Sequence, residues 1–307
     1  LSKQFIDFGG WNLFEKALAR TKASIFDYPI ISTNSKYLKL IKKFLRKQKI
    51  NKYKIILEPL KRDTGPAILS TALIKDIPLN QPMMIFTSDH LIDKLSVFNK
   101  AINNKKKFLT DKNVFVFGIK PKNPSTEYGY FLSKRIGKLN KVKKFIEKPK
   151  LTKAKQIIKN NGYWNSGMFY LRKDSIINNF KKYRPSMYKN CLKAVANSRY
   201  SNKVFYLNKT SFSKAAAKSF DYAILEKTND INAINLDIPW SDLGSWNEIS
   251  KIFNRDKAKY FKKKNVYYRP WGRYVNLFEG KDFLVKELTV NSKSSISLQK
   301  HHHRAEY

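Results

Sequence analysis

The sequence is short of cysteine, of acidic residues and of long apolar runs. Its one cysteine among 307 residues is Cys191. A single thiol cannot close an intramolecular disulfide and has no CxxC partner, which suits a reducing compartment. No apolar run approaches the roughly 18 residues that a membrane span needs. The first residues, LSKQFIDFGG, also lack the basic-then-apolar order of a signal peptide. These absences predict a cytoplasmic protein without a membrane partner.

Acidic residues are scarce, but the positive charge comes mostly from lysine, which is not typical of a protein that recognises nucleic acid. There are 62 Lys and Arg against 23 Asp and Glu, giving a formal net charge of +39. Only 11 of the 62 are arginine, whereas proteins that read DNA or RNA favour arginine and concentrate charge on one face. The lysines are spread along the chain, in runs such as KKFLRKQK and YFKKKN. We therefore predict no specific nucleic-acid partner, although the positive field should attract anionic substrates.

Short apolar runs alternate with stretches of helical periodicity over most of the chain. The runs of strand length are residues 54–59, 83–90, 114–119 and 167–172. The stretches with apolar residues three and four apart are residues 35–49, 65–74 and 95–109. This alternation predicts an α/β domain over residues 1–255, with a Rossmann-like, mostly parallel sheet and helices on both faces.

The pattern changes near residue 256. A basic joint, residues 256–265, leads to three short strand-like segments with no helix between them: GRYVNLF, DFLVKELTV and SSISLQKHH. We predict that residues 256–265 form a linker and that residues 266–307 form the first strands of an incomplete all-β domain. A unit of this size is too small to close a barrel or a sandwich alone.

Several polar residues stand where predicted strands end. In an open parallel sheet, ligands bind at the carboxyl ends of the strands. The residues at such positions are Asp89 after MMIFTS, Glu147 and Lys148 in FIEKP, Asn165 and Gly167 in WNSGMF, and Asp242 in WSDLGSW. Each also has an ordinary explanation as a helix cap, a turn or an exposed ion pair. Taken singly, these signals are weak.

The order of the motifs is more specific than any one of them. Along the chain run KQF, EPLKRDTGPA, TSDH, EYGYF, FIEKP, WNSGMF, FDYAILEKT, WSDLGSW, YRPWGRY and SLQKHHHRAE. This series closely resembles bacterial mannose-1-phosphate guanylyltransferases of the bifunctional type, which also carry a mannose-6-phosphate isomerase domain of the cupin kind. The resemblance covers almost the whole chain. It implies that mannose-1-phosphate attacks the α-phosphorus of GTP, forming GDP-mannose for polysaccharide biosynthesis and releasing pyrophosphate.

The resemblance also implies roles for individual residues. Nucleotidyl transfer needs the reacting phosphates held in line and their charge neutralised, with Mg²⁺ held by one or two carboxylates. We assign Mg²⁺ to Asp89 and Asp242, and phosphate binding to Lys3 and Lys148. The remaining assignments are Gly129, Glu147 and Asn165 for the sugar hydroxyls, and Glu58, Arg62 and Thr64 for the guanine and ribose. No general base is required, because the attacking phosphate is already ionised.

The histidine-rich end resembles the first metal motif of the isomerase cupin. There His301, His303 and Glu306 would ligate Zn²⁺ or a similar divalent ion. Because further strands and a further ligand are expected downstream, we predict no isomerase activity for the chain as written.

Three departures accompany the resemblance. The family's glycine-rich loop normally lies upstream of Lys3, before the point where this sequence starts, so we expect a chain incomplete at both ends. The connection between WSDLGSW and YRPWG is shorter than usual, and Asp63 and Gly65 stand where Asn and Ala are common.

Two alternatives remain. One is a nucleotidyltransferase for another sugar phosphate and nucleotide, which would lack the cupin start; the other is a basic nucleic-acid-binding protein. The sequence leaves a homo-oligomer possible.

Overall fold

The described part of the chain forms two units. The computed structural model describes residues 2–6, 10–243, 266–269, 271–280, 283–292 and 294–295. Unit 1 comprises Leu1–Ile6 and Trp11–Asp242, and unit 2 comprises Asp7–Gly10 and Leu243–Tyr307. Our domain boundary at residue 255 and our linker at 256–265 fall outside the described residues, so they stay predictions.

Unit 1 contains helices whose apolar faces are buried. The α-helices are α1 (Leu13–Arg20), α2 (Leu38–Lys47), α3 (Thr64–Ala72), α4 (Leu95–Lys105), α5 (Leu151–Lys159), α6 (Lys173–Tyr183), α7 (Pro185–Ala196) and α8 (Lys209–Phe212). Short turns are η1 (Lys3–Phe5), η2 (Ser35–Tyr37), η3 (Lys106–Phe108) and the π-helical η4 (Asp221–Leu225). Local signals explain several starts: the Asn12 side chain accepts a hydrogen bond from the Glu15 amide at α1, and Pro185 opens α7.

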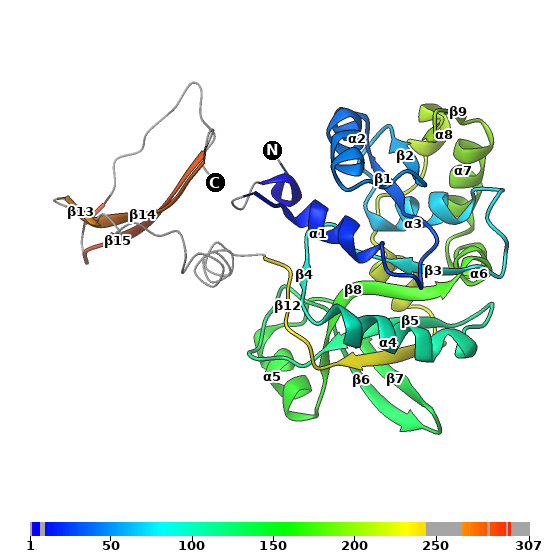
Figure 1. Ribbon diagram of the computed structural model, residues 1–307. Helices are drawn as coiled ribbons and strands as arrows, with labels where there is room; N and C mark the ends of the chain where they lie inside the picture. Colours follow the sequence, from blue (N-terminus) through cyan, green and yellow to red (C-terminus); the bar gives the residue numbers. More distant parts are fainter. Residues whose placement is uncertain are drawn as a thin grey trace. The chain divides into compact units, whose positions relative to one another are not determined.

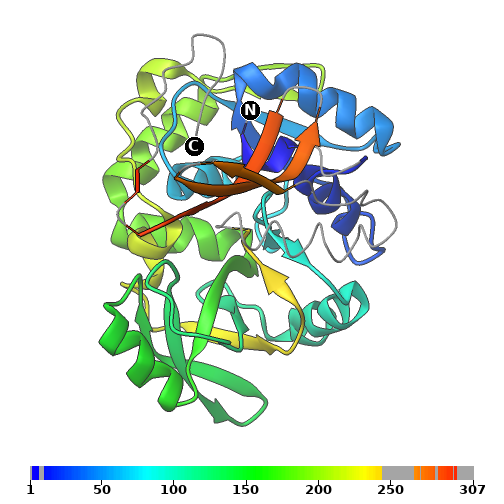
Figure 2. The same cartoon turned by 90° about the vertical axis from the view of Figure 1, so that its left-hand side faces the viewer.

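The larger sheet of unit 1 has six strands. In spatial order they are β3 (Pro82–Ile85), β8 (Tyr163–Arg172), β5 (Val114–Ile119), β11 (Ile231–Leu236), β7 (Leu139–Ile146) and β6 (Tyr130–Ile136). β5 and β11 run parallel, and the other neighbours are antiparallel. Figures 1 and 2 show the β6–β7 hairpin and α2 at opposite ends of unit 1.

The two faces of this sheet bury different clusters. Phe115 and Phe117 of β5 pack with Phe98 of α4, whereas Val114 and Val116 belong to the cluster of α6. Successive side chains of a strand point to opposite faces, so β5, buried throughout, supplies both clusters. Helices therefore cover both faces, which confirms the α/β class that the sequence predicts.

A second sheet has four strands, in the order β1 (Ile30–Asn34), β2 (Lys54–Glu58), β10 (Val204–Tyr206) and β9 (Arg199–Ser201). β1, β2 and β10 are parallel and β9 is antiparallel. The sequence pattern predicts one mostly parallel sheet, and this part of the prediction is wrong. Tight hairpins such as β6–β7, which turns at Gly137 with φ of 57°, make neighbours antiparallel.

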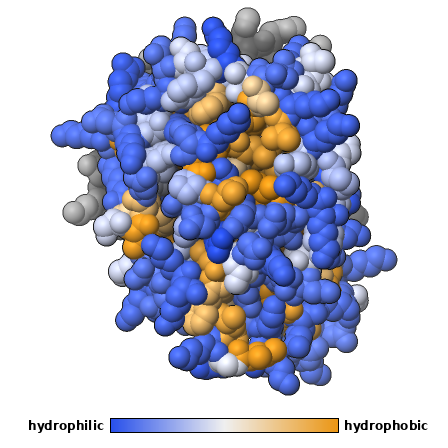
Figure 3. All heavy atoms as spheres, turned by 90° about the vertical axis from the view of Figure 1, so that its right-hand side faces the viewer, coloured by the Kyte–Doolittle hydropathy of each residue, from blue (hydrophilic) through white to orange (hydrophobic). Residues whose placement is uncertain are grey.

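An apolar groove of about 810 Å³ is lined by both β1 and β3. Each of these strands ends its sheet, with β2 and β8 respectively as its one neighbour among the described strands. The side chains around the groove include Ile30, Ile31, Met83 and Ile85. On the face of the molecule drawn in Figure 3, apolar side chains gather in a band between hydrophilic margins.

Unit 2 contains a three-stranded antiparallel sheet, in the order β13 (Val266–Arg269), β14 (Gly272–Gly280) and β15 (Phe283–Val290). It confirms strands at the predicted segments 272–278 and 282–290. The third predicted segment, 294–302, lies mostly outside the described residues. Across the described ranges of both units, no helix has the length and apolar character to cross a membrane.

Candidate active site

Strand pairing brings the two predicted metal carboxylates to one place. β4 (Leu91–Ile92) pairs antiparallel with β12 (Trp240–Ser241), with Leu91 opposite Ser241. In this register the residues just before β4 meet those just after β12, namely Asp89 and Asp242. The two are far apart in sequence, so only the fold places them at one end of the same small ladder.

Lys3 lies among the oxygen atoms of this pair. Its Nζ is 3.1 Å from Oδ2 of Asp89 and donates a 2.6 Å hydrogen bond to the main-chain oxygen of Asp242. The Lys3 and Asp89 side chains are 30% and 36% exposed, so the ion pair is open to an incoming ligand. The structure thus brings together the three residues to which the resemblance assigns Mg²⁺ and phosphate binding.

Aromatic side chains wall this site. Tyr128 Oη is 2.7 Å from Oδ1 of Asp242, and its ring packs edge-on against Trp164 and Trp240 at centroid distances of 4.9 and 5.4 Å. His90 packs edge-on against Trp240 at 5.3 Å. Burial lowers the pKa of His90 to about 4 despite the neighbouring Asp89, so the imidazole is neutral near pH 7.

Arg20 supports the loop that carries Asp89, and the sequence analysis missed it. Its guanidinium donates hydrogen bonds of 3.0 Å to the carbonyl of His90 and 3.1 Å to that of Thr87. The residue is only 4% exposed. Burial lowers the pKa of Arg20 to about 10, and the charge of Asp89 opposes this shift. In the sequence, Arg20 is indistinguishable from any other basic residue at the end of a helix.

A second cluster joins the residues assigned to the sugar. The Asn165 amide nitrogen of the main chain donates a 2.7 Å bond to the carbonyl of Gly129. A Cβ atom on Gly129 would lie 2.3 Å from Oε2 of Glu147, so a side chain here would displace that carboxyl group from its present position. Asn165 and Glu147 therefore both lie beside Gly129, and the roles of the three residues stay predictions.

The electrostatics of Glu147 are unusual. Burial, followed by the charge of Asp221, raises its pKa to about 7, and Lys148 opposes the shift. Its Oε2 atom is buried and has no hydrogen-bond partner among the described residues. Lys148 is exposed and adopts a φ of 45°, a left-handed conformation that is uncommon outside glycine. A carboxyl group with a raised pKa beside the exposed Lys148 side chain suits a ligand with hydroxyls and phosphate.

Asp221 is a further member of this cluster that the sequence analysis did not assign. Its Oδ1 accepts a 2.7 Å hydrogen bond from Nδ2 of Asn165. Burial raises the pKa of Asp221 to about 6, against the hydrogen bond from Asn165. The motif FDYAILEKT, quoted above without a role, was the available signal.

The residues assigned to the nucleotide are held by protein contacts. Glu58 accepts a 2.7 Å bond from the Ser32 hydroxyl, and burial raises its pKa. Arg62 donates a 2.5 Å bond to the carbonyl of Ser213, and Thr64 Oγ1 accepts from the amide of Phe220. The apolar groove is lined by Thr64, which is assigned to the nucleotide, by Asp89, which is assigned to the metal, and by the unassigned Asp221.

The described residues contain no group of three or more His, Cys, Asp or Glu side chains placed to hold a metal. The carboxylates of Asp89 and Asp242 still fit Mg²⁺, which commonly takes one or two carboxylates and fills its shell with phosphate and water. His301, His303 and Glu306 lie outside the described residues, so their metal site stays a prediction.

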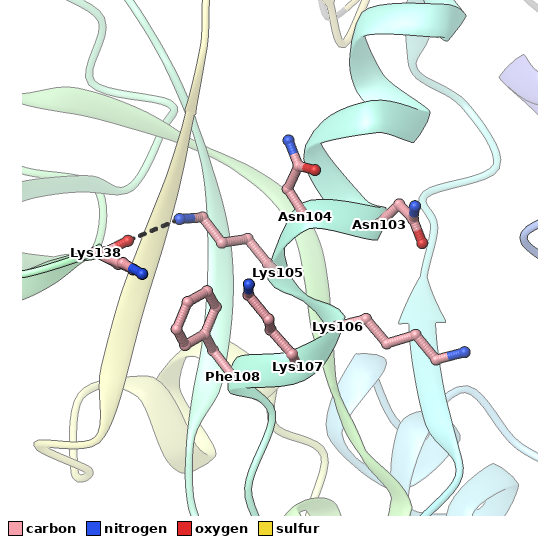
Figure 4. Close-up of a pocket in the computed structure, with 7 residues that line it drawn as sticks. All are labelled: Asn103, Asn104, Lys105, Lys106, Lys107, Phe108 and Lys138. Carbon is pink, nitrogen blue, oxygen red and sulfur yellow. Dashed lines mark hydrogen bonds between the residues drawn. The ribbon is translucent and has the colours of Figure 1, made fainter.

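A shallow hollow elsewhere is not a candidate. It is lined by Asn103, Asn104, Lys105, Lys106, Lys107, Phe108 and Lys138. Figure 4 shows the Lys105 Nζ donating to the carbonyl of Lys138, at 2.9 Å. Lys105 and Lys107 lie over the Phe108 ring. Exposed lysines on one aromatic ring are typical of a solvated surface.

Comparisons with known proteins cover both units. A nucleotidyl transferase family model matches residues 1–259, and one described as mannose-6-phosphate isomerase C-terminal matches residues 254–307. The chain is 28% identical to a mannose-1-phosphate guanylyltransferase of Salmonella montevideo over 380 residues, which covers 99% of this chain and 80% of the relative. It is 26% identical to the alginate biosynthesis protein AlgA of Pseudomonas fluorescens over 377 residues, covering 99% and 78%.

One solved structure is similar at the level of both fold and sequence. It is a mannose-6-phosphate isomerase from Helicobacter pylori, with a TM-score of 0.71 and 31% identity over 78% of this chain and 94% of that one. The two sequence alignments extend over more positions than the 307 residues present here, so those relatives contain internal residues that this chain lacks. This agrees with the shortened connection noted in the sequence.

Proposed function

Because the chain belongs to the nucleotidyl transferase family, whose model matches residues 1–259, we propose that it makes GDP-mannose and pyrophosphate from GTP and mannose-1-phosphate. The guanylyltransferase from Salmonella montevideo, aligned over 99% of this chain, supports the choice of substrates. The observation that carries the proposal in this molecule is the cluster of Lys3, Asp89 and Asp242, since it collects cationic and metal-binding groups at one point. The relative from Pseudomonas fluorescens supports a place in polysaccharide biosynthesis.

In the proposed reaction, a phosphate oxygen of mannose-1-phosphate forms a bond to the α-phosphorus of GTP, and the bond to pyrophosphate breaks. Asp89 and Asp242 would hold Mg²⁺, which neutralises phosphate charge when bound. Lys3 would approach the triphosphate once its contact with Asp89 is released, and Lys148 would bind the sugar phosphate. No side chain has to remove a proton from the attacking group, so positioning and charge neutralisation do the catalysis.

The two sides of the substrate would be read by different clusters. Glu147 and Asn165 would pair with the sugar hydroxyls, with Gly129 keeping the backbone close. On the nucleotide side, Glu58, Arg62 and Thr64 would line the base and ribose pocket. Their existing bonds to Ser32, Ser213 and Phe220 support a preformed pocket.

For residues 254–307, which match the mannose-6-phosphate isomerase C-terminal model, we propose a cupin-type isomerase unit. His301, His303 and Glu306 would supply metal ligands there.

A pyrophosphate-release assay with mannose-1-phosphate and each of GTP, ATP, UTP and dTTP tests the guanylyltransferase proposal. We expect GTP to be preferred, and binding of GDP-mannose by calorimetry to require Mg²⁺. Equal or faster turnover with dTTP would favour the alternative nucleotidyltransferase. Tight binding of duplex DNA with a steep salt dependence would favour the nucleic-acid alternative.

A further inference from the structure

Asp221 lies at the start of a widened helical turn. The amide of Glu226 donates a 3.0 Å bond to the carbonyl of Asp221, five residues back, which defines the π-helical turn η4. Such turns are rare in proteins, and those that occur are often found at functional sites. Asp221 is partly buried, and it is among the residues that line the groove. Asp221 therefore forms part of the wall of the groove.

The Asn165 side chain is held at both ends. Its Nδ2 donates to Oδ1 of Asp221 at 2.7 Å, and its Oδ1 accepts from the amide of Gly167 at 3.3 Å. A carboxylate accepts and a main-chain N–H donates, so the amide fits these partners in one orientation only. These contacts use one N–H and one lone pair of the Asn165 amide, and they fix on which side the other N–H and the other lone pair lie.

Acidic groups surround this contact. The charges of Asp63 and Glu226 act on Asp221, and Asp221 in turn acts on Glu147, whose other charged neighbours are Lys148 and Glu226. Placing several carboxyl groups together costs free energy in the free protein. A cluster of this kind is common where a site is prepared for a ligand rather than for stability.

We propose that Asp221 is a positioning residue of the sugar-phosphate site, which acts by fixing the donor and acceptor order of the Asn165 amide. This inference deepens the proposed function and rests on it. An amide free to flip would offer its donor and acceptor in either order, and ordering it during binding would lower affinity. Sugar hydroxyls both donate and accept, so a fixed amide selects one arrangement of neighbouring hydroxyls.

The test compares Asp221→Ala with Asp221→Asn by calorimetry with mannose-1-phosphate. Asp221→Ala removes the acceptor, and we expect the Kd to rise about tenfold, as for the loss of one charge-assisted hydrogen bond. Asp221→Asn keeps an acceptor oxygen, so we expect its Kd to stay within about threefold of the wild-type value. Asp230→Ala, which removes a surface carboxylate 3.7 Å from Lys141, is the matched control and should bind as wild type does.

A second measurement follows the Asn165 amide itself, by ¹⁵N NMR with asparagine labelling and assignment through the signal lost in Asn165→Asp. In the wild type we expect two well-separated side-chain protons, one of them bonded to Asp221. In Asp221→Ala they should move to the values of exposed asparagines, and in Asp221→Asn they should stay apart. Unchanged affinity or an unchanged amide signal in Asp221→Ala overturns the inference. Should the wild type bind neither mannose-1-phosphate nor GDP-mannose, the proposed function fails, and the amide signal alone decides whether Asp221 holds Asn165.

Discussion

At the scale of single residues, the site depends on charge more than on volume. Asp242 receives the Tyr128 hydroxyl on its carboxylate and Lys3 on its main-chain oxygen. Replacing the Asp242 carboxylate by an amide keeps the shape of the side chain and the main-chain carbonyl. It removes one of the two negative charges that are proposed to hold Mg²⁺.

We therefore expect Asp242→Asn to lower Mg²⁺-dependent turnover by at least about 100-fold with little change in melting temperature. Pyrophosphate release and circular dichroism check the two parts. Asp237→Asn makes the same change at an exposed position nearby and should leave both unaffected. Near-full activity in Asp242→Asn would show that the metal assignment is wrong.

Glu147 gives the free protein a pH dependence. Its pKa is raised to about 7 in the folded state, mainly by burial and then by Asp221. Between the usual glutamate pKa and pH 7, Glu147 loses its proton in the unfolded chain but largely keeps it in the folded protein. The contribution of this group to the free energy of unfolding therefore falls as the pH rises through this range to 7. Glu147 is only partly buried, and solvent screening reduces the effect to about 1 kcal/mol.

Glu147→Gln should consequently raise the melting temperature of the unliganded protein at pH 8 but leave it nearly unchanged at pH 4.5. Thermal denaturation at the two pH values measures the difference. Glu127→Gln, on an exposed loop, is the control and should show no such dependence on pH. An equal effect of Glu147→Gln at both pH values would contradict the assigned shift.

Single residues also mark where sequence reasoning stops. Asp89, Glu147, Asn165 and Asp242 could be singled out because the order of their motifs resembles that of a known family, and their roles stay predictions. Arg20 was missed because its function as a support depends on the carbonyls of Thr87 and His90, which only the fold brings within reach.

At the scale of elements, apolar periodicity predicted β5 with its observed bounds, Val114–Ile119, and a helix close to α4. Its prediction of strand direction, a mostly parallel sheet, was wrong. Residues 130–146 form the β6–β7 hairpin, whose exposed outer residues hide the alternation, and pairing partners are chosen by long-range contacts.

The contact between α3 and the segment before η4 depends on glycine. Gly65 donates its amide to the carbonyl of Lys218 at 3.0 Å, and a Cβ atom there would lie 2.4 Å from that oxygen. Alanine, the residue common in the resembling family, would be favoured by helix propensity alone. At this position the cost of the steric conflict with the main-chain oxygen of Lys218 is larger than the gain in helix propensity.

We expect Gly65→Ala to destabilise the protein by about 1–3 kcal/mol, as overpacking commonly does. Urea denaturation measures the change. Thr152→Ala, an exposed position in α5, gives a similar gain in helix propensity without a clash and should be neutral or slightly stabilising. If Gly65→Ala is as stable as the wild type, the backbone at Lys218 must be able to move away.

At the scale of the whole molecule, the formal charge of +39 says little about partners. Lysines cover surfaces unrelated to the site, as in the hollow around Phe108. We expect the function to depend instead on the small set of acidic residues in the two clusters described above.

The groove itself leads to the last prediction. β1 and β3 both line it and both end their sheets within the described residues, so each presents main-chain groups to an apolar space of about 810 Å³. Such edges accept an added strand readily. The test uses a version of the protein that is extended upstream of Leu1 by an apolar strand and a glycine-rich turn. We expect the added strand to lie in this groove. The added main-chain N–H groups could then contact the triphosphate next to Lys3 and Asp89.

Turnover of GTP and mannose-1-phosphate should rise by roughly 10²–10³-fold on extension, the usual value of preorganised donors, and the melting temperature should rise with it. The matched control carries the same extension with proline at alternate strand positions, which prevents pairing. Pyrophosphate release and hydrogen exchange of the β1 and β3 amides check the two effects. If the extension protects those amides without raising turnover, the groove accepts a strand but the triphosphate lies elsewhere. If neither changes, the space between β1 and β3 is not a strand site.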